Sequence, residues 1–314
     1  MSASLQTGGL AQAVFPPRPV HLAIGIFDGV HLGHRAVIEA AVQSARRSGG
    51  VAAVLTFAPH PSVLFRPESP TPLIMETETK AALLRDLGVE LVIVEPFTAA
   101  YAAIEAGDFV PELRRYLPRL ATVYVGENWR FGRGRKGDVA LLIAEGRKAG
   151  IGVFSAPRVN LDGEPISSTR IRALLTSGEI GAANTLLGRT YAAEGAVKPG
   201  KRLGRTLGFP TLNVDWAPGL RPRFGVYTVR VFGARAPDAR PGVANYGLRP
   251  TVEETSEPRL ETHVLGPCPY AEGDVIRVEW LSFLRPEQKF GSRAELEAQI
   301  GHDVAAARAE FSLP

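Results

Sequence analysis

Cysteine is almost absent from this sequence of 314 residues, in which Cys268 is the only one. A single thiol excludes an intrachain disulfide and a zinc site built from cysteines, so the simplest setting is a reducing cytoplasm. Long apolar runs are also absent, because no segment approaches the roughly 20 apolar residues that span a bilayer. The segment Met1 to Val20 has no basic start followed by an apolar stretch, which argues against a secretory signal. We expect a cytoplasmic protein without a membrane partner.

A large excess of charge of one sign is missing too, since 36 basic and 32 acidic residues leave a net charge of +4 at pH 7. Hydrophobic residues make up 45% and charged residues 22% of the chain, which excludes an intrinsically disordered protein. The slight basic excess suits anionic ligands, either nucleotides or nucleic acid. Single hydrophobic cores stop growing at about 250–300 residues. This chain of 314 residues exceeds that range, so we expect two domains.

The first half of the chain alternates short β-branched runs with helical stretches. Apolar runs predict strands at residues 21–26, 51–57, 90–94, 122–125 and 152–155. Ala, Leu and Glu at helical spacing predict helices at residues 35–48, 77–87, 108–117 and 139–149. Such alternation indicates a parallel sheet with crossover helices. We therefore expect a Rossmann-like α/β domain over residues 1–187, ended by a helical stretch from Ile166 to Leu187.

After Gly188 the chain changes to Gly-punctuated runs rich in Val, Tyr and Thr. Runs without intervening helices predict strands at residues 190–197, 225–232, 242–246, 260–265 and 275–281. This pattern favours a small closed β-barrel over residues 188–314. A final helix is expected from Ser292 to about Ala309, with Ser292 as N-cap and Glu295 completing a capping box.

Residues 25–34, GIFDGVHLGH, follow the first predicted strand and open a helix, at the place where open α/β sheets bind their ligands. The glycines let the backbone approach a ligand closely. His31 and His34 lie one helical turn apart, so both rings are expected near the N–H groups of the helix N-terminus, which attract phosphate. The alternatives are an ordinary turn with two surface histidines and an incomplete metal site.

Two later segments of the first half also carry polar and basic residues after predicted strands. Residues 126–137, GENWRFGRGRKG, mix an amide, aromatic side chains and four cations in a Gly-rich loop, which also fits a flexible basic loop or an RNA contact. Residues 166–172, ISSTRIR, place hydroxyls and two arginines at a helix start. These groups either cap the helix or bind a polyphosphate.

In the second half, residues 200–213, GKRLGRTLGFPTLN, join a Gly-rich basic loop to a Pro-Thr-x-Asn element. Loop amides and cations cradle phosphates, and the Thr211 hydroxyl and the Asn213 amide oxygen suit Mg²⁺. The segment is not a Walker loop. A β-turn with a capping threonine is the alternative.

Taken in order, these motifs resemble those of the bacterial bifunctional riboflavin kinases and FMN adenylyltransferases, also called FAD synthetases. In the first half the resemblance rests on residues 25–34, 126–137 and 166–172 together with TFAPHP at 56–61. In the second half it rests on residues 200–213, GVY at 225–227, GLRPT at 247–251, ETH at 261–263, and the pairs RP at 285–286 and KF at 289–290. The match covers nearly the whole chain.

The resemblance implies a nucleotidyltransferase domain and a barrel kinase domain, which use ATP and Mg²⁺ to convert riboflavin to FMN and FMN to FAD. It implies that His31 and His34 act in adenylyl transfer, that Glu261 is the general base of the kinase, and that Thr211 and Asn213 bind Mg²⁺. The ATP-binding residues it implies are Gly25, Phe27, Asp28, Gly29, Ser167, Ser168, Thr169, Arg172, Gly200, Gly204 and Arg205. The flavin-binding residues it implies are Phe57, Pro59, Asn128, Phe131 and Arg249.

Three positions depart from the family pattern. Trp129 stands where the family often has Phe, and this change preserves an aromatic face. Leu212 stands where Ala is usual, which would crowd the nucleotide. Residues 266–270, GPCPY, replace an acidic stretch and would change the flavin contacts of that loop.

Three other interpretations stay open. A class I aminoacyl-tRNA synthetase relative would also carry two histidines in such a turn, but no anticodon-binding helical region follows. A non-catalytic RNA-binding protein fits the basic loop and leaves the Pro-Thr-x-Asn and Glu-x-His motifs unexplained. An adenylyltransferase with an impaired kinase half is the third. We expect the partners to be the small molecules ATP, riboflavin and FMN rather than nucleic acid, and the sequence leaves the oligomeric state open.

Overall fold

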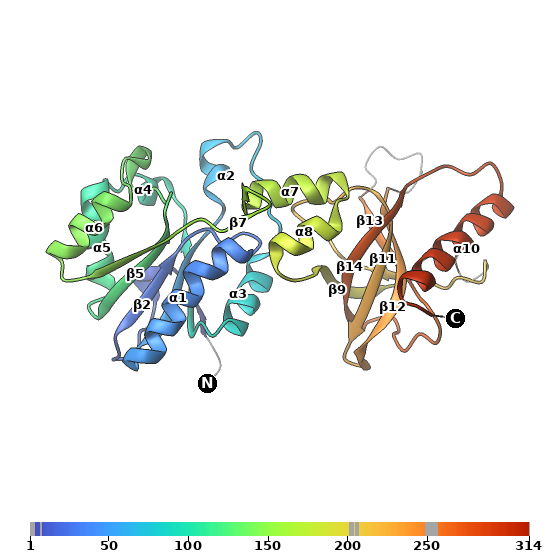
Figure 1. Ribbon diagram of the computed structural model, residues 1–314, viewed down its shortest axis with the longest axis horizontal. Helices are drawn as coiled ribbons and strands as arrows, with labels where there is room; N and C mark the ends of the chain where they lie inside the picture. Colours follow the sequence, from blue (N-terminus) through green and yellow to red (C-terminus); the bar gives the residue numbers. More distant parts are fainter. Residues whose placement is uncertain (1–3, 7, 201–203, 205–206, 249–256, 314) are drawn as a thin grey trace. The chain divides into compact units, whose positions relative to one another are not determined.

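A computed structural model gives the fold (Figure 1) and describes residues 4–6, 8–200, 204, 207–248 and 257–313. The chain forms two compact units, Met1–Ser168 and Thr169–Pro314. Arg205 and Arg249, two of the predicted site residues, lie outside the described residues. Among the helices that the structure describes, none is both long enough and apolar enough to cross a membrane.

The first unit is built on a six-stranded, wholly parallel sheet in the order β1–β4–β3–β2–β5–β6. Its strands are β1 (Ser4–Gln6), β2 (Val20–Ile24), β3 (Val51–Ala58), β4 (Leu91–Pro96), β5 (Leu120–Gly126) and β6 (Gly152–Ala156). Its helices are α1 (Leu32–Ser48), α2 (Pro61–Phe65), α3 (Thr77–Asp86), α4 (Ala99–Ala102), α5 (Phe109–Tyr116) and α6 (Val139–Lys148). The predicted α/β fold is confirmed. The short β1 and the hairpin of β7 (Asn160–Leu161) and β8 (Glu164–Pro165) were not predicted.

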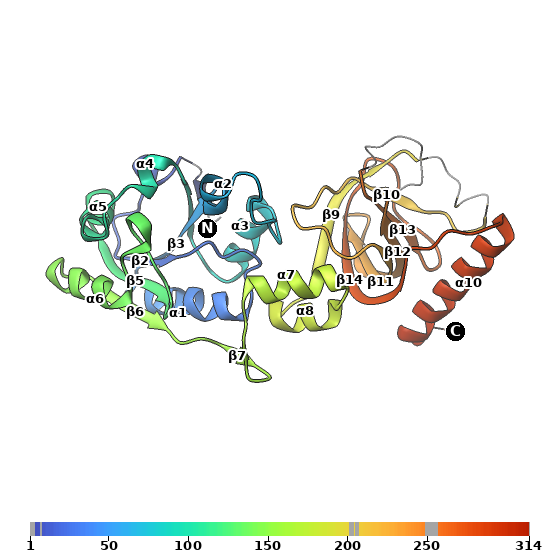
Figure 2. The same cartoon turned by 90° about the horizontal axis from the view of Figure 1, so that it is seen from above.

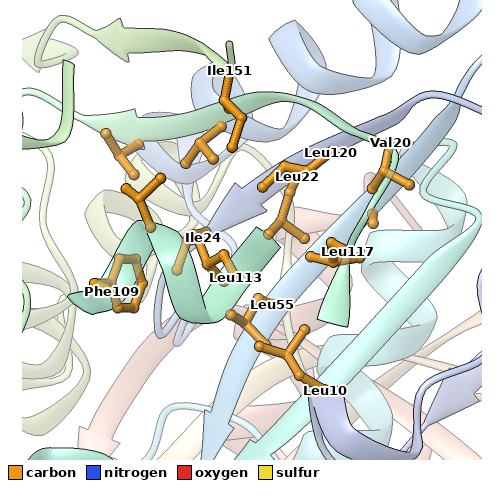
Figure 3. Packing of buried hydrophobic residues seen from close by; sticks show 14 of the residues in the cluster. Leu10, Val20, Leu22, Ile24, Leu55, Phe109, Leu113, Leu117, Leu120 and Ile151 are labelled. Atoms are coloured by element: carbon orange, nitrogen blue, oxygen red, sulfur yellow. The ribbon is translucent and has the colours of Figure 1, made fainter. Parts of the chain in front are cut away.

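Both faces of this sheet are buried. Successive side chains of a strand point to opposite sides, and here the side chains on each side pack in a core layer. Leu22 and Ile24 of β2 pack in a core layer with Leu113 of α5 (Figure 3). Ala23, between them, packs in a second layer with Ile38 of α1. A sheet covered on both faces leaves the ends of its strands as the accessible place for a ligand.

The expected helical stretch up to Leu187 is wrong as a single helix. The structure has α7 (Ser168–Ser177) and α8 (Ile180–Leu187), separated at Gly178, whose φ is 87°. A glycine in this left-handed conformation commonly ends a helix. Arg223 satisfies the exposed helix end, since its backbone N–H donates to the carbonyl of Leu175 and its guanidinium donates to that of Ser177.

The second unit contains a closed, antiparallel barrel in the order β10–β13–β12–β11–β14–β9, which confirms the predicted barrel. Its strands are β9 (Tyr191–Lys198), β10 (Leu212–Val214), β11 (Gly225–Gly233), β12 (Ala236–Gly247), β13 (Arg259–Val264) and β14 (Val275–Pro286). The unpredicted β10 closes the barrel, because it pairs with both β9 and β13. The interior is filled by aromatic side chains that include Tyr227, Tyr246 and Trp280, all fully buried.

The predicted final helix is present as α10 (Arg293–Glu310), which lies along the outside of the barrel (Figure 2). Ala307 of α10 packs with Val226 and Val243 of the barrel strands. The Ser292 hydroxyl caps the helix by accepting from the backbone N–H of Glu295. The Glu295 carboxylate accepts from the N–H of Gly291, one residue before the position that a capping box uses.

Helix α8 is joined to the barrel by hydrogen bonds of Asn184. Its amide donates to the carbonyl of Trp280 at 2.8 Å and accepts from the N–H of Tyr191 at 2.7 Å. Leu186 and Leu187 of the same helix are buried. The second compact unit therefore includes α7 and α8, whereas the domain boundary between residues 187 and 188 stays a prediction.

This packing predicts different stabilities for two fragments. Fragment 169–314 should unfold cooperatively, and fragment 188–314 should melt lower by roughly 10 °C or more. The shorter fragment loses the buried side chains of α7 and α8, among them Leu175, Leu186 and Leu187, worth about 1.5–3 kcal/mol each, besides the Asn184 bonds. Thermal melting followed by circular dichroism measures the difference, with Asn184→Ala in the longer fragment as the control for the hydrogen bonds alone. Equal melting temperatures would show that α7 and α8 do not support the barrel.

Candidate functional site

The turn between β2 and α1 has an unusual backbone. Phe27, Gly29 and Val30 have φ values of 51°, 88° and 39°, and a β-branched residue such as Val30 rarely adopts a positive φ. Such outliers persist where the surrounding structure holds them. Here the Asp28 carboxylate accepts from the N–H of Ile74 at 3.0 Å, and the Asp28 carbonyl accepts from the Ser168 hydroxyl at 2.8 Å.

The two predicted histidines meet at the start of α1. Their rings stack with centroids 3.6 Å apart, and His31 caps the helix by accepting from the backbone N–H of His34. Phe27 packs edge-on against His34, with the ring centroids 5.4 Å apart. A side chain at Gly33 would come within 3.2 Å of the His31 ring, a tight contact that would press on the stacked rings. Because His31 is only 4% exposed, the alternative of two surface histidines is wrong for this residue.

The other predicted segments of the first unit surround the same edge of the sheet. The chain order reverses between β2 and β5, which are neighbours in the sheet, and ligands bind at such a switch point. Residues 25–31 follow β2 and residues 126–137 follow β5. Ser168 reaches the turn through its bond to Asp28. Thr169 and Arg172 belong to the second unit, and their role stays a prediction.

Asn128, in the loop after β5, contacts a cation that the sequence did not single out. With its amide oxygen turned towards Arg158, that oxygen accepts from Nη2 of Arg158 at 2.7 Å. Arg158 also lies 3.4 Å from the carboxylate of Glu127. The sequence could have indicated Arg158 as a site residue, because it lies two residues after the end of β6, the last strand of the sheet along the chain. Phe131 is buried and stacks on Trp129 with centroids 4.8 Å apart.

An aromatic cluster extends from the end of β3. The Phe57 ring lies 5.7 Å from that of Phe97 and 5.4 Å from that of Tyr101, and Phe97 lies 6.0 Å from Phe65. Phe65 is 64% exposed, so the cluster has an accessible apolar side. Burial and the nearby carboxylates of the unit raise the pKa of the Tyr101 phenol well above its usual range. Only Phe57 and Pro59 were predicted here, because the other rings come from separate segments without a shared motif.

The second unit has a cavity of about 250 Å³ between the outer face of the barrel and α10. Asn213, Glu261 and Asn245 stand directly opposite one another on the adjacent strands β10, β13 and β12. Directly opposed residues share one face of a sheet. Glu261, Asn245 and Thr211 line the cavity. The structure therefore brings together the two motifs that the sequence separates by about 50 residues.

Oxygen atoms suited to a hard cation lie at this place. Oδ1 of Asn213 is buried and has no hydrogen-bond partner among the described residues. Thr211 lies two residues before Asn213 in the chain. His263 holds the segment that leads into Thr211, because its Nδ1 lies 2.8 Å from the carbonyl oxygen of Pro210. Amide and hydroxyl oxygens fit Mg²⁺, whereas no cluster of three His, Cys, Asp or Glu that could hold a metal occurs in the described part of the chain.

Gly204 and Gly200 lie so close to these groups that a side chain at either position would collide with them. A side chain at Gly204 would come within 2.4 Å of the Phe209 carbonyl oxygen, and one at Gly200 within 2.1 Å of the Asn213 amide. The departures from the family pattern lie elsewhere, since neither Leu212 nor residues 266–270 line the cavity. Tyr270 is buried, and its hydroxyl lies 3.2 Å from the carbonyl oxygen of Val231 and 3.0 Å from that of Ala236, to either of which it can donate.

A buried ion pair forms part of the cavity wall. Arg285, near the end of β14, binds Asp303 of α10 through two hydrogen bonds of 2.8 Å. Gln299 donates to the same carboxylate at 3.0 Å. The exposed fractions of the side chains are 18% for Arg285 and 7% for Asp303. The pair holds the helix that forms one wall.

The chain is similar to known proteins along nearly its whole length. Residues 16–170 match the family model of FAD synthetase, and residues 187–311 match that of riboflavin kinase. A bifunctional riboflavin kinase/FMN adenylyltransferase of Escherichia coli K12 is 37% identical over 304 residues, covering 97% of this chain and 96% of its own. The protein of that name from Listeria monocytogenes is 35% identical, covering 93% and 92%. A crystal structure of a protein named as macrolide-efflux, from Streptococcus pneumoniae, has a TM-score of 0.85 and 26% identity, covering 97% and 98%.

The ion pair predicts a loss of stability that can be measured. Asp303→Asn should lower the free energy of unfolding of the second unit by about 3 kcal/mol, because it leaves the Arg285 charge buried without its partner. Glu310→Gln on the same helix is the control, since Glu310 accepts from Ser282 at the exposed surface and its loss should cost less than about 0.5 kcal/mol. Urea unfolding followed by tryptophan fluorescence compares the two variants, and equal effects would contradict the assignment.

Proposed function

The chain belongs to the family of bifunctional riboflavin kinases and FMN adenylyltransferases, and on that premise we propose which residues carry each of its two reactions. It is a transferase that phosphorylates riboflavin to FMN and adenylylates FMN to FAD, with ATP as the donor in both steps. The observation that supports the assignment of residues is the co-occurrence of a stacked histidine pair at the start of α1 and a carboxylate between two amides on the barrel strands.

In adenylyl transfer, a phosphate oxygen of FMN forms a bond to the α-phosphorus of ATP while the bond from that phosphorus to the pyrophosphate oxygen breaks. Negative charge gathers on the leaving pyrophosphate and on the α-phosphate oxygens. His31 and His34 stabilise that charge by hydrogen bonding, assisted by the N-terminus of α1. Gly25, Phe27, Asp28 and Gly29 bind ATP through the turn, with Ser167, Ser168, Thr169 and Arg172 on the phosphates.

The aromatic cluster at the end of β3 is the proposed flavin site of this reaction. A flat, apolar ring system gains stability by packing on aromatic side chains. Phe57 and Pro59 line it together with Phe97, Tyr101 and the exposed Phe65, which the closeness of these rings supports. Asn128 and Phe131 orient the substrate from the loop after β5.

In riboflavin phosphorylation, the terminal hydroxyl of the ribityl chain attacks the γ-phosphorus of ATP and ADP leaves. Glu261 accepts the hydroxyl proton, a role that its place on the cavity wall supports. Gly200, Gly204 and Arg205 bind the nucleotide phosphates, and Arg249 contacts the flavin. Thr211 and Asn213 would hold Mg²⁺, which neutralises charge on the phosphates when bound.

The RNA-binding alternative is less well supported than the enzyme. Arg133 of the basic loop pairs with Glu105 at 3.2 Å, and Arg130 lies 3.6 Å from Asp138. Cations that are paired within the protein contribute less to binding a nucleic acid backbone, which depends on free positive charge.

Replacement of either histidine should abolish FAD formation and leave FMN formation intact. His31→Asn keeps a capping side chain and removes the imidazole, while His34→Ala removes the second ring. Each should lower the rate of adenylyl transfer by about 10²–10⁴. Chromatographic separation of riboflavin, FMN and FAD after incubation with Mg-ATP measures both reactions in one sample. Unchanged FAD synthesis in both variants would remove the histidines from the mechanism.

Glu261→Gln should lower riboflavin phosphorylation by about 10²–10⁴ and leave FMN adenylylation unchanged. Glutamine keeps the size and a hydrogen-bonding oxygen but cannot take up a proton at neutral pH. FMN supplied directly bypasses the kinase and is the internal control. Because phosphoryl transfer is largely dissociative, a loss below about tenfold would assign Glu261 to orientation of the hydroxyl.

Asn213→Ala should raise the Mg²⁺ concentration needed for half-maximal riboflavin phosphorylation by about tenfold or more. The change removes the buried Oδ1 atom, which has no hydrogen-bond partner among the described residues. The Mg²⁺ dependence of FAD formation from FMN in the same variant is the control and should not move. An unchanged Mg²⁺ titration of the kinase would exclude Asn213 as a ligand.

A further inference from the structure

Lys80 is a buried cation that neither proposed mechanism uses. It lies on α3 and is 7% exposed. Its Nζ donates to the hydroxyl of Thr56 at 2.9 Å and to the backbone carbonyl of Ile26 at 3.1 Å. Lysine is almost never buried unless it is paired, so its place inside the first unit needs a cause.

The carbonyl that Lys80 binds is the one at which the unusual turn begins. The Thr56 hydroxyl also donates to it, at 2.9 Å, so two donors from different elements converge on Ile26. Thr56 is itself fully buried on β3. The next residue, Phe27, has a positive φ, and its ring packs against His34. A shift of the Ile26 carbonyl would therefore move Phe27 and the imidazole that it contacts.

The charge of Lys80 has no evident benefit for stability. Burial lowers the pKa of its ammonium to about 8, and the neighbouring Asp28 carboxylate opposes this shift. An apolar side chain of equal length, such as methionine, would fill the space without the cost of removing a charge from water. Buried charges that cost stability are often kept where a functional site needs them.

We propose that Lys80 is a positioning residue for adenylyl transfer, which together with Thr56 fixes the Ile26 carbonyl and thereby sets the place of His34 beside the reacting phosphates. This inference rests on the proposed role of the histidine pair. The side chain acts through the backbone of the turn, because its hydrogen bonds go to the Ile26 carbonyl and the Thr56 hydroxyl. The three hydrogen bonds among Lys80, Thr56 and Ile26 form one unit, so the two side chains should be energetically coupled.

The first test is Lys80→Met in the full chain. The kcat of FAD formation from FMN should fall by about 10²-fold, the loss typical of a displaced catalytic group, while the KM for ATP changes less than about threefold. Riboflavin phosphorylation by the same sample should be unchanged. Lys148→Met is the matched control, because Lys148 is an exposed lysine of α6 paired with Glu145, and it should leave both reactions as they are.

The second test separates the hydroxyl from the size of residue 56 and works even if Lys80→Met does not fold. Thr56→Val removes the donor at constant shape and should lower the kcat of adenylyl transfer by about tenfold or more, whereas Thr56→Ser keeps the donor and should restore it. The double variant Lys80→Met/Thr56→Val should lose little beyond the more severe single variant. Additive losses would show that the two side chains act independently and would overturn the proposal.

A wild-type kcat in Lys80→Met with an unchanged melting temperature would also overturn it, as would equal activity of the valine and serine variants at position 56. The proposed function fails separately. If His31→Asn and His34→Ala leave FAD formation intact, the site itself is wrong. If they abolish it while Lys80→Met does not, only the positioning role is lost.

Discussion

The burial of both faces of the parallel sheet is the constraint on which the first site depends. Leu22 and Ile24 fill one core layer and Ala23 the other, so no face of the sheet is left for a ligand. Polar chemistry is confined to the segments that follow the strands. The turn after β2 then has to change direction within a few residues, which requires left-handed backbone at Phe27, Gly29 and Val30. The groups that hold this backbone are part of the site for that reason.

In the barrel, too, burial of side chains decides where a ligand can bind, but there it leaves the outer face accessible. Its interior is filled by Tyr227, Tyr246 and Trp280, so the cavity lies on the outer face, where every second residue of a strand points. Glu261 therefore faces outwards, while the neighbouring Thr262 is fully buried. An outer face alone does not exclude water. Helix α10 supplies the second wall, and the Arg285–Asp303 pair holds it there.

Both units thus keep buried polar groups that an apolar residue could replace. Lys80 and Asp303 are 7% and 6% exposed, and each makes at least two hydrogen bonds to other elements of its unit. In the ion pair of Asp303 with Arg285, removal of one partner costs more than the pair contributes, because the remaining charge is left without compensation. Lys80 and Asp303 both connect elements that are distant in sequence, and so they determine geometry more than they add stability.

The sequence by itself determined the fold class, the family and the order of the motifs, because alternation of strands and helices and short motifs are local properties. The tertiary structure decided what depends on contacts between distant segments. The three residues of β10 are too short for a periodic signal, yet they close the barrel and set Asn213 beside Glu261. The rings of Phe57 and Phe97 share no motif. Lys80 belongs to none of the sequence motifs, and its bond to the carbonyl of Ile26 exists only in the fold. Pairing partners of this kind are chosen by packing in three dimensions, which no local pattern encodes.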